Sequence, residues 1–177
     1  MKVLVVVDMQ NDFITGSLGT DEAVKIVPNV VQKIAEFDGE ILATMDTHHA
    51  DYLNTQEGKN LPVPHCIKTT DGWNLCQSVA DVFWEKRGEA FRKPAFGSCD
   101  LAFHLAKGNI REQLDEVVLV GLCTDVCVIS NALLIKAFLP EVKITVDASC
   151  CAGVTLESHK TALEAMKMCQ INVINEV

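Results

Sequence analysis

Short runs of apolar residues alternate with longer amphipathic stretches along the chain. The first run, residues 3–7, is Val-Leu-Val-Val-Val and contains no polar position. A run of this kind is typical of a parallel strand that is buried on both faces. In residues 21–37, by contrast, apolar side chains recur three and four positions apart, which indicates a helix with one buried face.

Repetition of these two patterns predicts the order of the elements. We expect strands at residues 3–7, 40–45, 81–84, 116–121, 142–146 and 171–174. We expect helices at residues 21–37, 73–80, 98–105, 124–138 and 155–168, with Ser98 as a cap. Pro28 is expected to lie in the first turn of its helix, because proline is tolerated there and not in a helix interior. Strands that alternate with helices predict an α/β fold with a parallel sheet.

Composition limits the class of molecule. The chain has 177 residues, 49% of them hydrophobic, which is enough for a substantial core in a single domain over residues 1–177. The formal net charge is -9, whereas nucleic acid and anionic membranes attract clustered Lys and Arg. We therefore expect no nucleic-acid partner and no membrane partner, and small molecules as ligands.

The same reasoning predicts a cytoplasmic protein with free thiols. Residues 3–7 are too short for the apolar core of a signal peptide, and Asp8 interrupts them. No stretch approaches the ~18 apolar residues of a membrane span. The eight cysteines are then expected to be unpaired, because disulfides are typical of secreted chains.

One cysteine lies where a predicted strand becomes a predicted helix. The run at residues 116–121 leads into Gly121-Leu-Cys-Thr-Asp-Val-Cys-Val128, where Thr124 is expected to cap the helix. Cys127 then occupies the third helical position, where free backbone amides and the helix dipole favour a thiolate. This is the environment of a nucleophile, although a free cysteine is more often a small buried apolar residue.

Two of the predicted strands end next to reactive side chains. Asp8 follows the first strand, and the Cys127 turn follows the run at residues 116–121. In open parallel sheets, ligands bind beyond the carboxyl ends of the strands, where the strand order reverses. Asp8 and Cys127 can therefore meet. Residues 46–72 add a long polar connection with three of the five histidines, and connections of this length are usually functional.

Three motifs, taken together and in this order, resemble the isochorismatase-like cysteine hydrolase superfamily. They are Asp8-Met-Gln-Asn-Asp-Phe13, Lys93 and the Gly121-to-Val128 stretch. Asp46-Thr-His48 and Pro64-His65-Cys66 further resemble the metal ligands of the nicotinamidase branch. The resemblance covers essentially the whole chain. It implies a doubly wound (Rossmann-like) sheet of six parallel strands with helices on both faces.

The resemblance implies a catalytic triad of Asp8, Lys93 and Cys127. A thiol is mostly protonated near neutral pH, so it needs a base, and a carboxylate at a strand end suits that role. A buried carboxylate and thiol also need a nearby cation, which Lys93 supplies. The resemblance also implies an oxyanion hole formed by the backbone amides of Cys123 and Cys127, with a cis peptide before Cys123. Taken alone, Asp8 could as readily cap the next turn. Lys93 alone is more often a solvated surface residue.

The resemblance also implies a divalent metal ion held by Asp46, His48 and His65. Two nitrogen donors and one oxygen donor suit zinc, with iron or manganese as alternatives. Many nicotinamidases have a further histidine six residues after the first, but Asn54 occupies that position here. Others have a glutamate nine residues after it, and we expect Glu57, which occupies that position, to be the fourth ligand.

Phe13 and Phe96 are expected to sandwich the ring of the substrate, as aromatic side chains do in nicotinamidases. A third aromatic residue, common shortly before the Pro-His pair, is replaced here by Leu61-Pro-Val-Pro64. The resemblance implies hydrolysis of nicotinamide. The missing aromatic residue leaves another small amide or a carbamoyl compound as the alternative substrate. A non-catalytic, thiol-sensing module is the alternative from a different class. The family also implies a homo-oligomer.

Overall fold

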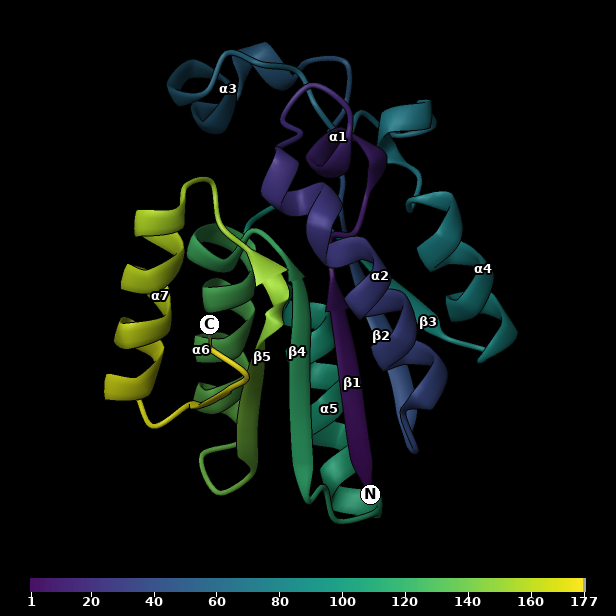
Figure 1. Ribbon diagram of the computed structural model, residues 1–177, viewed down its shortest axis with the longest axis vertical. Coiled ribbons are helices and arrows are strands. Elements are labelled where there is room, and N and C mark those ends of the chain that lie inside the picture. The colour runs from purple at the N-terminus through teal and green to yellow at the C-terminus, as the bar shows by residue number, and fades with distance from the viewer. Residues whose placement is uncertain (177) are drawn as a thin grey trace.

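A six-stranded parallel sheet forms the centre of the computed structural model, which describes residues 1–176 (Figure 1). The strand order is β3-β2-β1-β4-β5-β6, and every neighbouring pair is parallel. The strands are β1 (Lys2–Val7), β2 (Glu40–Asp46), β3 (Glu89–Lys93), β4 (Glu116–Leu122), β5 (Lys143–Ala152) and β6 (Asn172–Ile174). This confirms the predicted α/β fold with a parallel sheet.

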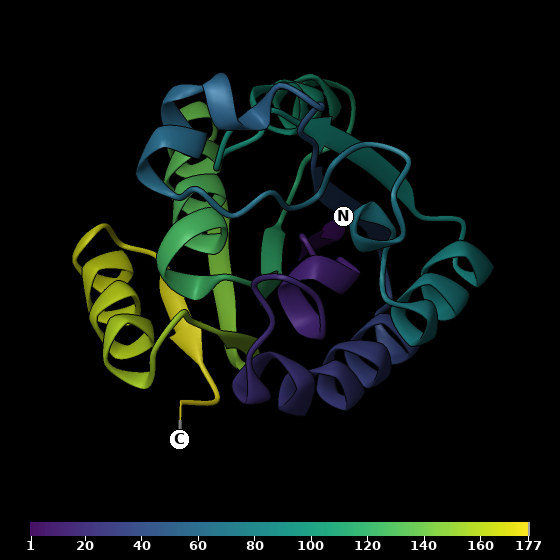
Figure 2. The ribbon, with the colours of Figure 1, turned by 90° about the horizontal axis from the view of Figure 1, so that it is seen from above.

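Helices cover both faces of the sheet, as the view from above shows (Figure 2). The α-helices are α1 (Asn11–Ile14), α2 (Asp21–Glu36), α3 (Gln56–Asn60), α4 (Gln77–Glu85), α5 (Cys99–Arg111), α6 (Ile129–Phe138) and α7 (Leu156–Met168). Two 3₁₀ turns, η1 (Tyr52–Asn54) and η2 (Asp71–Trp73), and one π-helical turn, η3 (Thr124–Val128), complete the set. The doubly wound arrangement is therefore confirmed.

The two faces of the sheet bury two separate apolar cores. Val3, Val5 and Val7 of β1 pack in one core with residues of α5, α6 and α7. Leu4 and Val6 point the other way and pack with residues of α2 and α4. Successive side chains of a strand alternate between faces, so a strand covered on both sides has no polar position. This explains the uninterrupted apolar run with which the chain begins.

The third strand lies outside the predicted range. Residues 81–84 belong to α4, where Val79 and Phe83 are buried at helical spacing, and β3 lies in what the sequence predicts to be a loop. The pattern is misleading because β3 is at the edge of the sheet and only Lys93 among its residues is buried. A strand with little buried surface has no apolar run by which to recognise it.

Pro28 does not mark the start of its helix. The helix α2 begins at Asp21, where the Thr20 hydroxyl accepts a hydrogen bond from the Ala23 amide at 3.0 Å, and Pro28 lies in its interior on the exposed side. An interior proline costs about 3 kcal/mol. Burial of Ile26, with three further apolar residues on the same face, offsets this, since each large side chain contributes about 1.5–3 kcal/mol.

The fifth strand is longer than predicted and continues through residues 147–152. The prediction ended too early because Asp147, Ser149 and two cysteines interrupt the apolar pattern there. All eight cysteines are free thiols, as expected. Among residues 1–176, no helix is both long enough and apolar enough to span a membrane.

Candidate active site

The predicted residues come together at the carboxyl ends of the four adjacent strands β3, β2, β1 and β4. Asp8 follows β1, Asp46 ends β2 and Lys93 ends β3, where it pairs in register with Asp46. Cys127 lies in η3, directly after β4. The chain builds the sheet outward from β1 to β3 and then crosses to β4 on the other side of β1, so the strand order reverses between β1 and β4.

The ammonium of Lys93 contacts both the carboxylate of Asp8 and the thiol of Cys127. Lys93 Nζ lies 2.7 Å from Asp8 Oδ2 and 3.4 Å from Cys127 Sγ. The other carboxylate oxygen, Asp8 Oδ1, accepts a hydrogen bond from the Thr44 hydroxyl at 2.7 Å. Asp8, Lys93 and Cys127 are all buried. Three ionisable groups are thus held together away from solvent.

Burial and these charges set the protonation states. Burial, followed by the charge of Asp8, raises the pKa of Cys127 well above its ordinary value, so the resting thiol is protonated. Burial alone would lower the pKa of Lys93, but Asp8 and the other acidic groups around it raise that pKa instead, so Lys93 is cationic. A thiol held in this state becomes a nucleophile only after a base removes its proton, and a helix dipole does not suffice to ionise it.

The turn that carries Cys127 departs from the predicted helix. The helix was expected to begin with Thr124 as its cap, but residues 124–128 form a π-helical turn whose N-cap is Cys123. The amides of Val126 and Val128 both donate to the Cys123 carbonyl, at 3.1 and 3.0 Å. The Leu122–Cys123 peptide is cis, as the family resemblance implied. π-Helical turns inside helices frequently lie at functional sites.

Four predicted metal ligands converge beside the triad. One donor atom from each of Asp46, His48, Glu57 and His65 lies within 4.8 Å of the other three. His48 Nε2 is 3.0 Å from Asp46 Oδ2 and 3.5 Å from Glu57 Oε1. His65 Nδ1 is bonded to the Val63 carbonyl at 2.8 Å, so its Nε2 faces the group. Two imidazoles and two carboxylates at these separations suit a divalent transition ion.

Gln10, which the sequence analysis did not single out, holds Asp46 in place. Its amide nitrogen donates to the Asp46 carbonyl at 2.9 Å and to the Trp73 carbonyl at 2.8 Å. Its oxygen accepts a hydrogen bond from the Asp46 amide at 2.7 Å, and the whole side chain is buried. A buried amide with all these bonds satisfied is rigid. Its position two residues after Asp8 in the first motif was the available signal.

Tyr52 is a second support that the sequence analysis missed. Its ring centroid lies 4.7 Å from that of His48 and 5.0 Å from that of His65, and its hydroxyl donates to the Leu61 carbonyl at 2.9 Å. The side chain is 1% exposed. Tyr52 thus joins two candidate ligands to the segment that carries Leu61. A single tyrosine in a polar connection gave no signal of this role.

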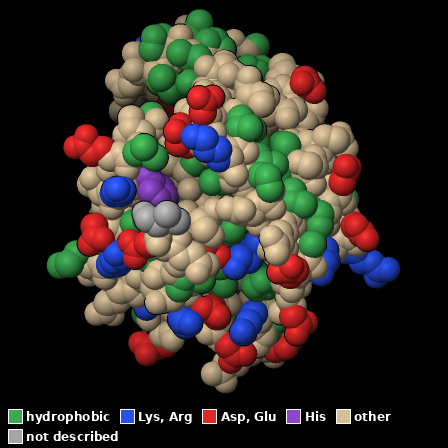
Figure 3. Space-filling view, viewed as in Figure 1, with side chains coloured by type: hydrophobic (Ala, Val, Ile, Leu, Met, Phe, Trp, Pro, Cys, Tyr) green, Lys and Arg blue, Asp and Glu red, His purple; other side chains and the backbone are tan. Residues whose placement is uncertain are grey.

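A largely apolar cavity of about 170 Å³ reaches both the thiol and the metal-ligand group. Phe13 and Phe96 both line it; Phe13 is buried, whereas Phe96 is 46% exposed at the surface. The other lining residues are Leu18, Thr20, Ala23, Asp46, Glu57, Leu61, His65, Leu122, Cys123, Val126, Cys127, Gly153 and Val154. Hydrophobic side chains gather at this end of the molecule over α3 (Figure 3), where Leu53 and Leu61 are exposed.

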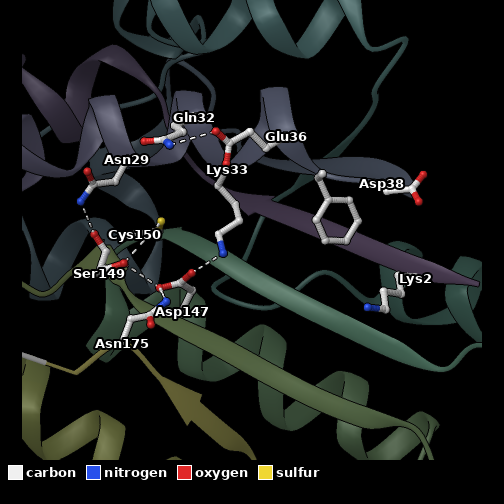
Figure 4. Close-up of a pocket in the computed structure, with 11 residues that line it drawn as sticks. Lys2, Asn29, Gln32, Lys33, Glu36, Asp38, Asp147, Ser149, Cys150 and Asn175 are labelled. Atoms are coloured by element: carbon white, nitrogen blue, oxygen red, sulfur yellow. Dashed lines mark hydrogen bonds and ion pairs between the residues drawn. The ribbon is translucent and has the colours of Figure 1, made fainter.

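A larger hollow of about 550 Å³ lies elsewhere, between α2 and β5 (Figure 4). Its central contact joins Lys33 Nζ to the buried Asp147 Oδ2 at 2.5 Å. Ser149 and Asn175 donate to Asp147 Oδ1 at 2.8 and 3.0 Å. Lys33 and Asp147 thus neutralise each other, and burial, followed by the charge of Asp147, raises the pKa of the Cys150 thiol, which also lines the hollow. Chemistry, rather than size, therefore selects the smaller cavity as the candidate site.

A family model for the isochorismatase domain matches residues 2–176. This chain belongs to the isochorismatase family. Among its relatives, the nicotinamidase/pyrazinamidase of Mycobacterium tuberculosis is 26% identical over an alignment of 189 positions, gaps included, which covers 98% of each protein. The match supports the expected nicotinamidase-like branch of the family.

Solved structures agree with this family assignment. The pyrazinamidase/nicotinamidase of Streptococcus mutans superposes with a TM-score of 0.83 at 28% identity, covering 98% of this chain and 100% of the other. The pyrazinamidase of Pyrococcus horikoshii in complex with zinc superposes with a TM-score of 0.77 at 26% identity, covering 99% of each chain. The predicted superfamily and fold are confirmed, while the roles of individual residues stay predictions.

Proposed function

We propose that this chain is a metal-dependent amidohydrolase that converts nicotinamide and water to nicotinate and ammonia. The observation that carries the proposal is the buried Lys93 ammonium, which contacts both the Asp8 carboxylate and the Cys127 thiol next to a four-residue ligand group. Relatives named as nicotinamidases, which match nearly the whole chain, support the same activity.

In the first half of the reaction, Asp8 takes the proton of the Cys127 thiol, and the sulfur attacks the carboxamide carbon. The amides of Cys123 and Cys127 stabilise the negative oxygen that forms, and loss of one such donor costs on the order of 3 kcal/mol in the barrier. The C–N bond then breaks as Asp8 returns its proton to the nitrogen. Ammonia leaves, and a thioester remains on Cys127.

In the second half, Asp8 takes a proton from water, and the oxygen attacks the thioester carbon. The C–S bond breaks, the thiolate recovers a proton from Asp8, and the carboxylic acid is released. Lys93 stays cationic throughout and stabilises whichever of its two neighbours carries negative charge. The buried Asp8 is suited to this work because burial raises its pKa towards the pH at which it must exchange protons.

Asp46, His48, Glu57 and His65 would hold a divalent metal ion, and zinc is proposed ahead of iron and manganese. When bound, such an ion acts as a Lewis acid that can bind and orient a ring nitrogen of the substrate. Phe13 and Phe96 would then contact the two faces of the ring, and the apolar walls exclude water from the reacting carbon. We further propose that one domain carries all these groups and that the protein forms a homo-oligomer.

Measurement of ammonia release from nicotinamide by the purified protein tests the proposal. Wild type is expected to be active, and Cys127→Ala is expected to abolish turnover because no thioester can form. Cys169→Ala, at an exposed position outside the cavity, serves as the matched control and is expected to retain full activity. Ammonia release by Cys127→Ala at the wild-type rate would falsify the mechanism.

A second candidate substrate class is another small amide or a carbamoyl compound. The lack of an aromatic residue in Leu61-Pro-Val-Pro64, shortly before His65, favours testing it. Assays of ammonia release from nicotinamide, pyrazinamide and N-carbamoyl compounds distinguish the two substrate classes. Absence of hydrolysis of both ring amides would exclude nicotinamide as the substrate. Alkylation with iodoacetamide addresses the thiol-sensing alternative: one fast thiol at Cys127 supports an enzyme, whereas uniformly slow labelling of all eight supports a passive role.

A further inference from the structure

The nucleophile turn, defined as residues 123–128, is tied to a distant part of the chain by the side chain of Thr124. The Thr124 hydroxyl lies 2.8 Å from Nδ1 of His159, in the second turn of α7. Thr124 is fully buried. A buried hydroxyl with a specific partner fixes the backbone that carries it, because leaving it unpaired costs about 1–3 kcal/mol.

The next residue of the turn makes a second connection to the same region. Both carboxylate oxygens of Asp125 lie 3.1 Å from the amide of Val154, which donates to them. Gly153 and Val154 also line the cavity. Asp125 therefore joins the nucleophile turn to the segment at Gly153 and Val154, which lines the same cavity.

Gly153 lets α7 approach the cavity closely enough for these contacts. A β-carbon at this position would lie 2.9 Å from His159 Cβ and 3.0 Å from His159 Cα. Such distances leave no room for a side chain unless α7 moves. The β5–α7 connection, the first turns of α7 and the nucleophile turn are thus packed as one unit at the cavity.

We propose that Asp125 and His159 are positioning residues, which hold the nucleophile turn so that Cys127 and the amides of Cys123 and Cys127 face the substrate. The proposal rests on the proposed amide hydrolysis. Neither residue contacts the thiol, so each acts through the turn. Thr124, which contacts His159, and Asp125 both lie between Cys123 and Cys127 in the chain. A small shift of this segment therefore moves both amide donors away from the developing oxyanion.

The charge of Asp125 and its hydrogen bonds have opposite effects on the nucleophile turn. Burial, followed by the charge of Asp125, raises the pKa of Cys123 to about 12, so Asp125 disfavours negative charge at this turn. Its useful contribution must then be the contact with Val154. Asp125→Asn removes the charge but keeps one acceptor oxygen for the Val154 amide, whereas Asp125→Ala removes both.

The experiment compares kcat and KM for nicotinamide in this pair, with melting temperatures to identify variants that fail to fold. Asp125→Ala is expected to lose about tenfold in kcat, equivalent to about 1.4 kcal/mol in the barrier, with KM changed less than about twofold. Asp125→Asn is expected to recover most of that loss. Lys160→Ala, next to His159 on the exposed surface, is the control and is expected to match wild type.

A second pair tests the other contact. His159→Asn keeps a polar group near the position of Nδ1 and is expected to retain more kcat than His159→Phe. Equal kcat in wild type, Asp125→Ala and His159→Phe would overturn the inference, as would equal losses in Asp125→Asn and Asp125→Ala. If wild type does not hydrolyse nicotinamide, the proposed function fails separately, and the rate of Cys127 alkylation by iodoacetamide replaces kcat: slower alkylation in Asp125→Ala supports the inference, and an unchanged rate overturns it.

Discussion

At the scale of single residues, the contacts of Lys93 fit the proposed reaction better than a stabilising role. Its ammonium lies 2.7 Å from Asp8, 3.4 Å from Cys127 and 3.5 Å from Asp46. Burying such charges costs several kcal/mol per ion, and a buried ion pair is weak evidence for stability. In the proposed mechanism, the role of Lys93 is to stabilise negative charge on either Asp8 or Cys127 as the proton moves.

Tyr52 gives a prediction at this scale, because a single oxygen atom links it to the cavity wall. Tyr52→Phe keeps the ring against His48 and His65 but removes the hydrogen bond to the Leu61 carbonyl. A lost bond of this kind is worth about 1 kcal/mol. We expect KM for nicotinamide to rise roughly fivefold, in line with that free energy, while kcat and metal content stay the same.

The matched control for this prediction is Tyr52→Leu, which also removes the ring. Because the ring packs against both candidate ligands, Tyr52→Leu is expected to lower the affinity for zinc, measured by titration of the metal-free protein. If Tyr52→Phe lowered zinc affinity as much as Tyr52→Leu, the hydroxyl would have a different role from the one assigned to it.

At the scale of elements, the contact between Lys33 and Asp147 anchors α2 to β5 (Figure 4). Burial would raise the pKa of Asp147, but hydrogen bonds from Lys33, Asn175 and Ser149 lower it below its ordinary value. A carboxyl with a lowered folded-state pKa contributes stability above its unfolded pKa of about 3.9, and that stability is lost as the pH falls. The anchor therefore weakens in acid.

Asp147→Asn tests this anchor. We expect it to reduce the free energy of unfolding by about 2 kcal/mol at pH 7, because a hydrogen-bonded charge is lost. The difference from wild type is expected to shrink as the pH falls below about 4, because the unfolded wild-type chain takes up a proton at Asp147 before the folded state does. Urea unfolding at each pH measures it. Glu164→Gln, at an exposed ion pair with Lys167, is the control and should change stability by less than about 0.5 kcal/mol.

The elements also show where sequence patterns lose their information. The central strands β1 and β4 are buried on both faces, so their apolar runs predict them well. The edge strand β3 has mostly exposed or half-buried residues, and its pattern does not differ from that of a loop. Pro28 is compatible with the interior of α2 only because the buried face of that helix offsets the cost, which depends on packing.

At the scale of the whole molecule, the candidate metal group joins three separate segments within residues 46–65. Asp46 ends β2, Glu57 lies in α3, and His65 follows a Pro-Val-Pro segment. Removal of metal with a chelator is therefore expected to abolish amide hydrolysis and to lower the melting temperature, since bound ligands stabilise the folded state. Added zinc is expected to restore both.

Two variants test the identity of the fourth ligand. Glu57→Ala is expected to weaken zinc binding by at least roughly 10- to 100-fold, whereas Asn54→Ala is expected to leave it unchanged. Metal titration of the two metal-free proteins gives the comparison. Weaker binding in Asn54→Ala, together with normal binding in Glu57→Ala, would show that the ligand assignment is wrong.

The sequence alone determined the features that depend on local pattern and residue type. Double-sided burial requires continuous apolar strands, and this predicted the parallel sheet. The candidate residues Asp8, Lys93 and Cys127, and the ligand set that includes Glu57, came from a family resemblance that short sequence motifs carry. All of these residues are close together in the structure.

Only the tertiary structure decided the features that depend on residues distant in sequence. The position of β3 and the contacts of Gln10, Asp125 and His159 all depend on such partners. A hydrogen bond between residues 35 or more positions apart has no periodic signature, because its geometry exists only once the chain has packed. The sequence thus predicts the groups proposed to react, whereas the fold holds them in place.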